Sequence, residues 1–172
     1  MQEILSHCPL PAVILVSSQR TAEDLEPICV SLGHTPLVIH AGKGEMERQA
    51  CIDRFVTGEG SILISTSIVS RGMQLCPVTT LINYDVPSCS EEYLHRARFV
   101  NHETVIEAAI WTFISLEERK FAHPICCILQ KSGQEIPHKV LKMAISYMKH
   151  EYIPPNNNPF KWEDIDSHGR AD

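Results

Sequence analysis

The feature that most constrains this chain is a series of short, continuous apolar runs separated by helical segments. The runs are Ala12–Ser17, Pro36–His40, Ser61–Ser65, Thr80–Tyr84 and Ala108–Phe113. Continuous apolar runs, as opposed to alternating ones, are typical of strands that are buried on both faces. Strands that alternate with helices favour a parallel sheet joined by right-handed crossovers. The sequence therefore predicts an α/β domain of three layers, with a mainly parallel sheet flanked by helices.

The segments between and after these runs have helical periodicity. Helices are predicted over residues 21–32, 45–56, 115–129 and 137–147, and another begins at residue 90. Gly33 is placed to end the first helix, and Pro27 is expected in its first turns or at a kink. Ser90 is the expected N-cap of its helix, and residues 115–118 resemble a capping box. The expected inner face of the helix over 45–56 consists of Met46, Ala50, Ile52, Phe55 and Val56.

Length and composition set the organisation. The 172 residues and a hydrophobic content of 44% fit one globular domain, predicted over residues 1–150. Residues 151–172, which contain Ile153-Pro-Pro-Asn-Asn-Asn-Pro159, are predicted to be an extended tail or linker. No apolar run is long enough for a membrane span, and the N-terminal residues lack the charged flank of a signal peptide. The expected partners therefore do not include a membrane.

The net charge and the cysteine content limit the kinds of ligand that the chain is expected to bind. The net charge of −6 argues against strong, autonomous RNA binding, although it leaves room for a local basic groove. The seven cysteines form no Cys-x-x-Cys pair, so reduced thiols that act as small apolar residues are expected. No metal site is expected, because the Cys and His residues are not grouped at ligand spacing.

The residues that follow each predicted strand are the most informative, because ligands of such sheets bind beyond the carboxyl ends of the strands. In order along the chain, these segments resemble the motifs of superfamily 2 RNA helicases of the DEAD-box type. Val13–Arg20 resembles motif IV, Ile39–Arg48 the segment that ends in Gln-x-x-Arg, Ile64–Leu75 motif V, Leu81–Pro87 the strand after it, and Tyr93–His102 motif VI. Gly133–Pro137 resembles the junction before the closing helix of the family. The resemblance runs from about Val13 to Met143.

The resemblance implies a RecA-like C-terminal helicase domain. In that family a preceding RecA-like domain closes with this one around ATP, Mg²⁺ and a single RNA strand. The second domain contacts the RNA backbone without reading its sequence. The positions that match the RNA-contacting motifs are Ser18, Arg20, Arg48, Thr66, Arg71 and Gly72. Glu45 occupies the position of the glutamine in Gln-x-x-Arg, and its carboxylate is expected to repel phosphate.

Motif VI and the end of motif V depart from the family pattern at the residues that serve ATP hydrolysis. The two arginine-finger positions hold Phe99 and His102, and the position of the ribose-binding aspartate holds Gln74. Arg96 and Arg98 remain as candidates for weak nucleotide contact. A shift by one residue would place Arg98 at the first finger position. Because such arginines neutralise charge on the transferred phosphoryl group, their loss predicts very slow hydrolysis.

Several residues have a structural alternative that the sequence leaves open. Arg71 and Arg96 can brace loops through ion pairs as readily as they can contact a ligand. Phe99 can be an exposed aromatic on a protein-binding surface, although burial in the core is the expected outcome. His40 ends a strand without a paired nucleophile, so no catalytic role is expected for it.

Three functions follow from these observations. The favoured one is a degenerate helicase-like module that binds single-stranded RNA, partner proteins or itself within a larger protein. The alternatives are a working half of an ATP-dependent RNA helicase and a protein-interaction domain without RNA contact. Degenerate cores of this kind resemble those of Tudor-domain proteins of the germline small-RNA (piRNA) pathway. That likeness implies RNA silencing, other pathway proteins as partners, and a cytoplasmic location in perinuclear ribonucleoprotein granules.

Overall fold

The computed structural model describes residues 2–66, 75, 78–100 and 108–150 of the chain. Its residues gather into two compact units, Met1–Ile114 and Ser115–Asp172. The predicted domain over residues 1–150 crosses that division and stays a prediction. The predicted tail over residues 151–172 lies outside the described residues.

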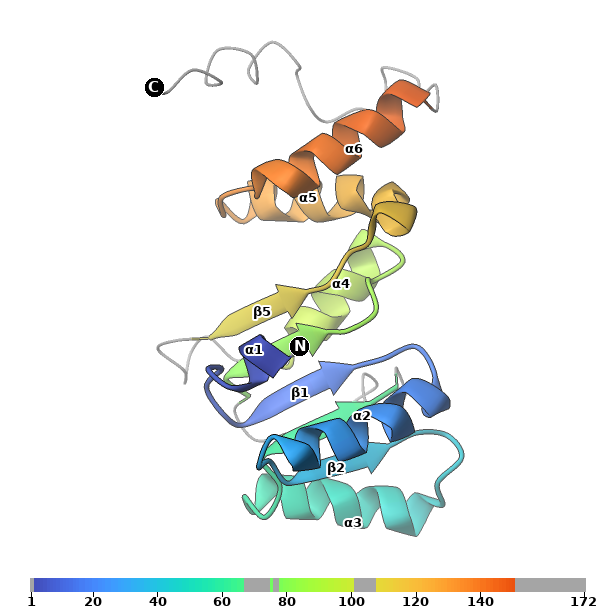
Figure 1. Ribbon diagram of the computed structural model, residues 1–172, viewed down its shortest axis with the longest axis vertical. Helices are drawn as coiled ribbons and strands as arrows, with labels where there is room; N and C mark the ends of the chain where they lie inside the picture. The colour runs from blue at the N-terminus through green and yellow to red at the C-terminus, as the bar shows by residue number, and fades with distance from the viewer. Residues whose placement is uncertain (1, 67–74, 76–77, 101–107, 151–172) are drawn as a thin grey trace. The chain divides into compact units, whose positions relative to one another are not determined.

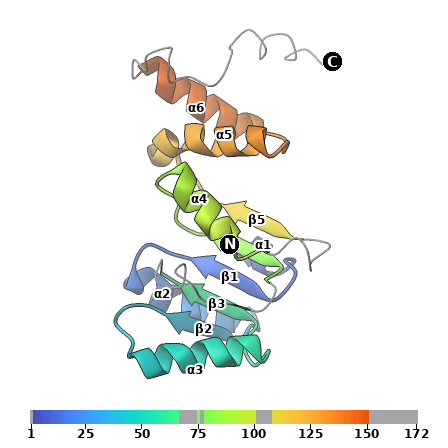
Figure 2. The ribbon, with the colours of Figure 1, turned by 180° about the vertical axis from the view of Figure 1, so that it is seen from behind.

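The first unit is built on a parallel sheet of five strands. The strands are β1 (Ala12–Leu15), β2 (Pro36–Ile39), β3 (Ile62–Ser65), β4 (Thr80–Asn83) and β5 (Ala109–Thr112). Their order across the sheet is β2-β3-β1-β4-β5, and every neighbouring pair is parallel. Figures 1 and 2 show β1 at the centre of this unit. The predicted fold class, a RecA-like domain with a parallel sheet between helices, is confirmed.

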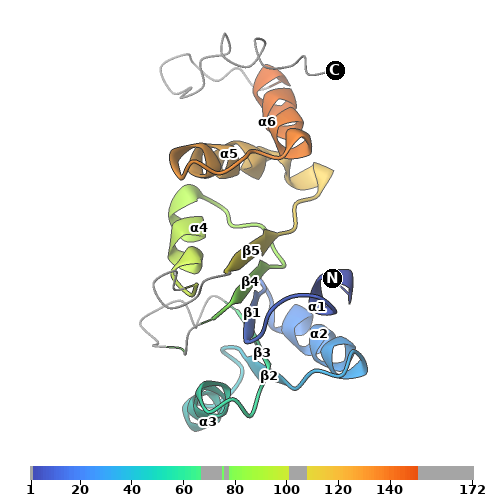
Figure 3. The ribbon, with the colours of Figure 1, turned by 90° about the vertical axis from the view of Figure 1, so that its left-hand side faces the viewer.

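Helices cover both faces of this sheet. They are α1 (Gln2–Leu5), α2 (Gln19–Ser31), α3 (Glu45–Val56) and α4 (Ser90–Ala97). In Figure 3, α1 and α2 lie on one side of the sheet, and α3 and α4 lie on the other side. The alternate residues of β1 enter two separate cores, with Ile14 facing α2 and Leu15 facing α3. Burial on both faces explains why the strands are continuous apolar runs in the sequence.

Helices α2 and α3 agree with the sequence predictions in part. In α2, Ala22, Leu25 and Cys29 are buried and Gly33 follows the helix with a φ of 84°, so the predicted stop is confirmed. Pro27 lies inside α2 and not in its first turns, so that alternative was wrong. In α3 only Ile52 and Phe55 are fully buried.

The remaining residues of the expected inner face of α3 point elsewhere. Met46 is 89% exposed and Val56 46% exposed, and Ala50 is also exposed. At about 100° per residue, Met46 and Ala50 lie on the side of the helix opposite Ile52. The error arose because apolar residue type was weighed above helical phase.

The start of α4 also differs from expectation. Cys89 holds the N-cap position and makes no side-chain cap, while the expected N-cap Ser90 is the first helical residue. The capping contacts come instead from Glu92, whose carboxylate accepts hydrogen bonds from the amide and hydroxyl of Ser88 at 2.8 and 2.6 Å. Glu92 thereby accepts hydrogen bonds from the residue just before the N-cap.

The second unit contains a 3₁₀ helix over Leu116–Phe121 followed by α5 (Ala122–Lys131) and α6 (His138–His150). The predicted capping box is confirmed, because the Ser115 amide and hydroxyl both donate to Glu118. The single predicted helix over 115–129 is instead a 3₁₀ turn and an α-helix. Pro124 has no amide hydrogen to donate to the carbonyl four residues earlier, which disfavours a continuous α-helix through this point.

Candidate functional site at the carboxyl edge of the sheet

The candidate RNA-contacting residues come together because the three strands that precede them end at one level. In the parallel register, Leu15 of β1 and Ile39 of β2 both pair with Ser65 of β3. The chain leaves β1 towards Ser18, β2 towards Arg48, and β3 towards Thr66. Ligands of open parallel sheets bind at this edge. The structure therefore places the described part of the predicted RNA set on one edge of the first unit.

Ser18 and Arg20 form the start of α2. Ser18 is the N-cap of the helix, and its hydroxyl oxygen accepts a hydrogen bond of 3.0 Å from the amide of Thr21. The Arg20 side chain is 91% exposed, and its Nε lies 3.8 Å from a carboxylate oxygen of Asp24. An ion pair that long and that exposed contributes little to stability. The Arg20 guanidinium is thus available to an anion.

Arg48 is held more firmly. Its Nη1 donates a hydrogen bond of 2.6 Å to the carbonyl of Lys43, in the loop between β2 and α3. Lys43 in turn lies 3.1 Å from Glu47. In this state Arg48 braces its own loop, and only part of its donor set is left for a ligand. Glu45 is exposed at the first residue of α3, where its carboxylate faces solvent.

Thr66 directly follows β3 and is half-buried. Its amide donates 3.2 Å to the carbonyl of Ile39, and its own carbonyl accepts from the Ser65 hydroxyl at 2.8 Å. The predicted contacts Arg71 and Gly72 and the ribose position Gln74 lie outside the described residues.

A buried histidine stands at the same edge. His40 is 4% exposed, and among the described residues neither ring nitrogen makes a hydrogen bond. Its Nε2 lies 3.4 Å from Glu23 of α2. A methyl group on Gly42 would come within 2.7 Å of the Gln19 side-chain oxygen and 3.1 Å of the His40 ring. This close packing fixes the loop after β2 against α2, which supports a structural role for His40.

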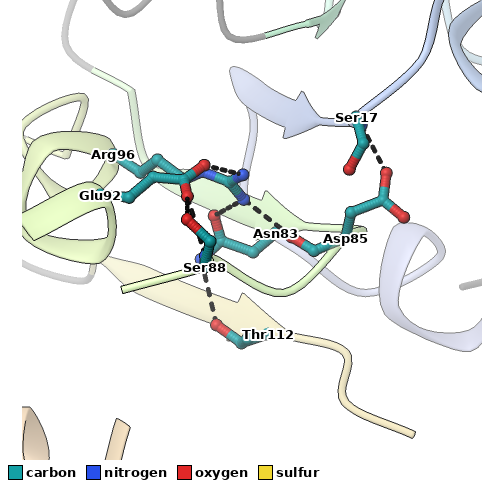
Figure 4. A network of polar contacts seen from close by, with 7 residues as sticks. All are labelled: Ser17, Asn83, Asp85, Ser88, Glu92, Arg96 and Thr112. Carbon is teal, nitrogen blue, oxygen red and sulfur yellow. Dashed lines mark hydrogen bonds and ion pairs between the residues drawn. The ribbon is translucent and has the colours of Figure 1, made fainter. Parts of the chain in front are cut away.

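Arg96 of motif VI is the most completely bonded side chain of the site, and Figure 4 shows its contacts. Its Nη1 donates to the side-chain oxygen of Asn83 at 3.1 Å and to the carbonyl of Asp85 at 2.7 Å. Its Nη2 contacts Glu92 at 2.5 Å. The residue is 6% exposed. Of the two roles that the sequence left open for Arg96, this geometry is that of a structural brace.

The network around Arg96 ties together three strands and a helix (Figure 4). Asn83 of β4 also donates 3.0 Å to the hydroxyl of Thr112 on β5. Asp85 accepts a 2.5 Å hydrogen bond from the amide of Ser17, which follows β1. Arg96 and Glu92 lie on α4, and the guanidinium bonds to Asn83 and Asp85 at the end of β4. These hydrogen bonds hold the helix against the carboxyl end of that strand. We refer to Asn83, Asp85, Ser88, Glu92 and Arg96 as the arginine clamp.

The electrostatics of the clamp favour its charged form. Burial acts to raise the pKa of Glu92, but the hydrogen bonds from Ser88 and the positive charge of Arg96 outweigh it and hold the pKa below its usual value of 4.5. Burial also raises the pKa of the neighbouring Tyr93 hydroxyl, and its hydrogen bond with Thr112 opposes that effect. Glu92 therefore stays ionised at neutral pH and balances the buried guanidinium.

The finger positions lie just beyond α4. Phe99, at the first of them, is half-buried and packs against the core cluster that contains Val13, Leu15 and Phe55. The structure thus places this ring against the core, as expected from the sequence. Arg98 is exposed. His102, at the second finger position, lies outside the described residues.

Sequence reasoning missed four members of the clamp. Asn83, Asp85, Ser88 and Glu92 were not expected to contribute to the site. The four-residue spacing of Glu92 and Arg96 on one helix is a recognisable ion-pair signal. Nothing in the linear sequence marks Asn83 as a partner of Arg96, because the fold brings β4 under α4.

The part of the chain that the structure describes offers little for other kinds of site. Within it, no three His, Cys, Asp or Glu side chains are grouped so that they could hold a metal ion. No described helix is long and apolar enough to cross a membrane. Arg98 is the exposed arginine among the described motif VI residues, whereas the Nη1 and Nη2 groups of Arg96 are engaged within the domain.

The fold and the edge described above define a RecA-like helicase domain, and comparison with known proteins agrees. Residues 1–98, more than half of the 172, match the family model of the helicase conserved C-terminal domain. The chain belongs to this family, and it is a C-terminal helicase domain of the DEAD-box class.

Two individual relatives have RNA helicase names. It is 33% identical over 135 residues to the pre-mRNA-processing ATP-dependent RNA helicase prp5 of Sclerotinia sclerotiorum, a match that covers 78% of this chain and 12% of the relative. It is 34% identical over 132 residues to the ATP-dependent RNA helicase DBP2 of Chaetomium thermophilum, covering 77% of this chain and 24% of that protein. The chain thus spans only a small part of the length of these relatives.

Solved structures give the same fold. The RNA helicase Prp28 of Chaetomium thermophilum, bound to ADP, superposes with a TM-score of 0.71 at 25% identity, over 81% of this chain and 35% of that one. The C-terminal domain of the DEAD-box protein Dbp5 superposes with a TM-score of 0.66 at 22% identity, over 87% of this chain and 88% of that one. The second likeness concerns the fold alone.

Proposed function

We propose that this domain is the C-terminal half of a DEAD-box-like protein that holds RNA and partner proteins but supports little or no ATP hydrolysis. The observation that carries the proposal is the position of Phe99. An aromatic ring packed on the core stands where the family places a phosphoryl-stabilising arginine. The buried arginine nearby, Arg96, is engaged by its own domain. Phosphoryl transfer depends heavily on cationic groups that neutralise the charge of the transition state, so their loss slows the reaction strongly.

RNA contact is supported by the residues at the carboxyl edge of the sheet. Ser18, Arg20 and Thr66 follow neighbouring strands, and Arg20 is almost fully exposed. Backbone amides and small hydroxyls hold phosphates without reading bases. The acidic balance of the chain and the exposed Glu45 limit the affinity, so RNA binding by the domain alone is weak and depends on a preceding RecA-like domain. ATP and Mg²⁺ would be held mainly by that preceding domain.

Partner proteins are the second part of the proposal. The C-terminal domain of Dbp5 has been solved bound to Gle1, and the DEAD-box protein SrmB bound to the regulator of ribonuclease activity A. These structures support the use of such domains as docking platforms. The names of the prp5 relatives favour pre-mRNA processing as the setting. The germline small-RNA setting, with its perinuclear granules, stays a prediction that none of the relatives described above supports.

A domain-swap experiment tests the loss of hydrolysis. The chain replaces the C-terminal helicase domain of a prp5 relative, and RNA-stimulated ATP hydrolysis is measured. We expect the rate to fall by about 10³-fold, the lower range of what an arginine finger contributes. Restoring arginine at Phe99 and His102 together should recover part of it, whereas Phe99→Leu, which keeps an apolar side chain, should not. Hydrolysis by the unaltered chimera at the parent's rate would overturn the proposal.

The competing function is a working helicase half in which Arg98 has taken over the finger role. The exposure of Arg98, one residue before the finger position, favours it. In the same chimera, Arg98→Ala then abolishes hydrolysis. On the favoured proposal Arg98→Ala changes little, because there is little activity to lose.

RNA binding is tested separately on the full chain. Binding of a single-stranded RNA is followed by gel shift as the salt concentration rises. Arg20→Ala should weaken binding and reduce the slope of log affinity against log salt by about 0.7, the value of one lost phosphate contact on a single strand. Arg54→Ala is the matched control, because Arg54 lies at the far end of α3 and pairs with Glu59. Equal effects of the two variants would exclude a specific RNA edge.

A further inference from the structure

The start of α4 couples an exposed hydroxyl to the buried arginine clamp. Ser88 is exposed, in the turn between β4 and α4. Its hydroxyl donates 2.6 Å to one carboxylate oxygen of Glu92, and Arg96 contacts the other oxygen of the same carboxylate. Figure 4 shows the three side chains in this sequence. A change at the Ser88 oxygen therefore acts directly on the charge that balances Arg96.

The local sequence suits a particular enzyme class. Ser88 is followed at the third and fourth positions by Glu91 and Glu92. A carboxylate three residues after a hydroxyl is a pattern that acid-directed serine kinases can select through a basic substrate cleft. Glu91 is exposed and takes no part in the clamp, and its carboxylate has only hydrogen bonds at the start of α4, one of them with Cys89, so a basic cleft can reach it.

We propose that Ser88 is a phosphorylation site for an acid-directed serine kinase, and that the phosphate displaces Glu92 as the partner of Arg96. In the reaction, the Ser88 oxygen forms a bond to the γ-phosphorus of ATP. The bond from that phosphorus to the oxygen bridging to the β-phosphate breaks, and ADP leaves with the electron pair. The hydroxyl proton passes to a carboxylate base of the kinase.

The consequence follows from charge and geometry. The phosphoester oxygen no longer has a proton to donate to Glu92, and the phosphate brings a charge of about −1.5 to −2 beside that carboxylate. Two anions cannot share the position, and Arg96 forms bidentate contacts with phosphate as readily as with a carboxylate. Glu92 is therefore released to solvent, α4 loses its cap, and the clamp is rebuilt on the phosphate.

The chain offers a matched control at Ser115. This serine is also exposed, also has glutamate three residues later, and also donates its hydroxyl to that carboxylate, at 2.8 Å. Among the described residues no arginine is bonded to Glu118. A phosphate on Ser115 disturbs a cap as well, but it has no buried guanidinium to capture.

The first experiment maps the site. The full chain is incubated with ATP, Mg²⁺ and an acid-directed serine kinase, and modified residues are identified by mass spectrometry. Phosphate should appear on Ser88, disappear in Ser88→Ala, persist in Ser90→Ala, and fall severalfold in Glu91→Gln. Circular dichroism verifies that each variant is folded. Absence of phosphate on Ser88 in the unaltered, folded chain would overturn the assignment.

The second experiment tests the exchange of partners. Phosphoserine is placed at position 88 or at position 115 during protein synthesis, and the Nε–H signal of Arg96 is followed by NMR. Phosphate at 88 should move that signal and lower Tm by on the order of 3 °C, whereas phosphate at 115 should leave the Arg96 signal in place. An unmoved Arg96 signal in the position-88 protein would show that Glu92 keeps the guanidinium, and the proposed exchange would be wrong.

Discussion

Removal of the Glu92 carboxylate should cost the first unit a large share of its stability. Glu92→Ala leaves the Arg96 guanidinium, whose side chain is 8% exposed, without its charged partner. Breaking a fully buried ion pair costs about 3–5 kcal/mol, and exposed pairs contribute at most about 1 kcal/mol. Glu92 itself is 30% exposed, so solvent screening reduces the expected loss to about 2–3 kcal/mol. Domains of this size are stable by about 5–15 kcal/mol, so the loss is easily measured.

Urea unfolding followed by tryptophan fluorescence measures this loss. Trp111 lies on β5 in the first unit, and a Trp162→Phe background removes the signal of the second tryptophan. With a urea dependence of about 2 kcal/mol per molar, the midpoint should fall by about 1 M. Glu91→Ala, one residue away and outside the clamp, is the control and should lower the midpoint much less, because the exposed Glu91 carboxylate has only hydrogen bonds at the start of α4 and no buried charge to balance. Equal midpoints for the two variants would refute the role assigned to the clamp.

The same carboxylate has a pH signature. The pKa of Glu92 lies below its usual value of 4.5 in the folded chain, so its ionised form stabilises the fold fully above that value. This contribution is lost as the pH falls through the lower, folded-state pKa. The difference in stability between the unaltered chain and Glu92→Gln should therefore be constant from pH 7 down to about 5 and shrink below 4.5. A difference that persisted unchanged into strong acid would show that the carboxylate charge is not what stabilises the clamp.

Three further outcomes are expected. Ser115→Ala removes a side chain of the capping box and should cost about 1 kcal/mol, measured by helical circular dichroism during thermal unfolding. Burial raises the pKa of the Cys29 thiol to about 11, so at pH 8 a thiol reagent should label the exposed Cys89 within minutes and leave Cys29 unlabelled until the protein unfolds; equal labelling rates would contradict its burial. Gly60→Ala places a methyl group 2.3 Å from a terminal carbon of Leu37, and the expected loss of about 1–3 kcal/mol is read from the unfolding midpoint.

The sheet could be predicted from the sequence because its cause is local. Each strand is buried on both faces, so each is a continuous apolar run that stands out from the helices around it. The five runs all became strands, and each predicted boundary lies within two residues of the observed one. The edge at which the motifs meet was expected from the rules of parallel sheets and from the family resemblance, whereas the strand order was not predicted and comes from the structure.

The arginine clamp was only partly predictable, because its contacts depend on how β4 and α4 pack together. The sequence left open whether Arg96 contacts a ligand or braces a loop. That choice depends on Asn83 and on the carbonyl of Asp85, which reach Arg96 only after β4 and α4 pack together. The side of α3 that faces the core was misjudged at Met46 for a related reason. The type of a residue alone does not determine which side of a helix is buried.

The position of Phe99 links the stability of the domain to the chemistry proposed for it. An arginine there would take an aromatic ring away from the core and would have to bring its charge to the surface of the same loop. A single Phe99→Arg substitution would thus weaken the fold without supplying the second finger. On the proposed function, Phe99 serves the fold at a position that serves hydrolysis elsewhere in the family.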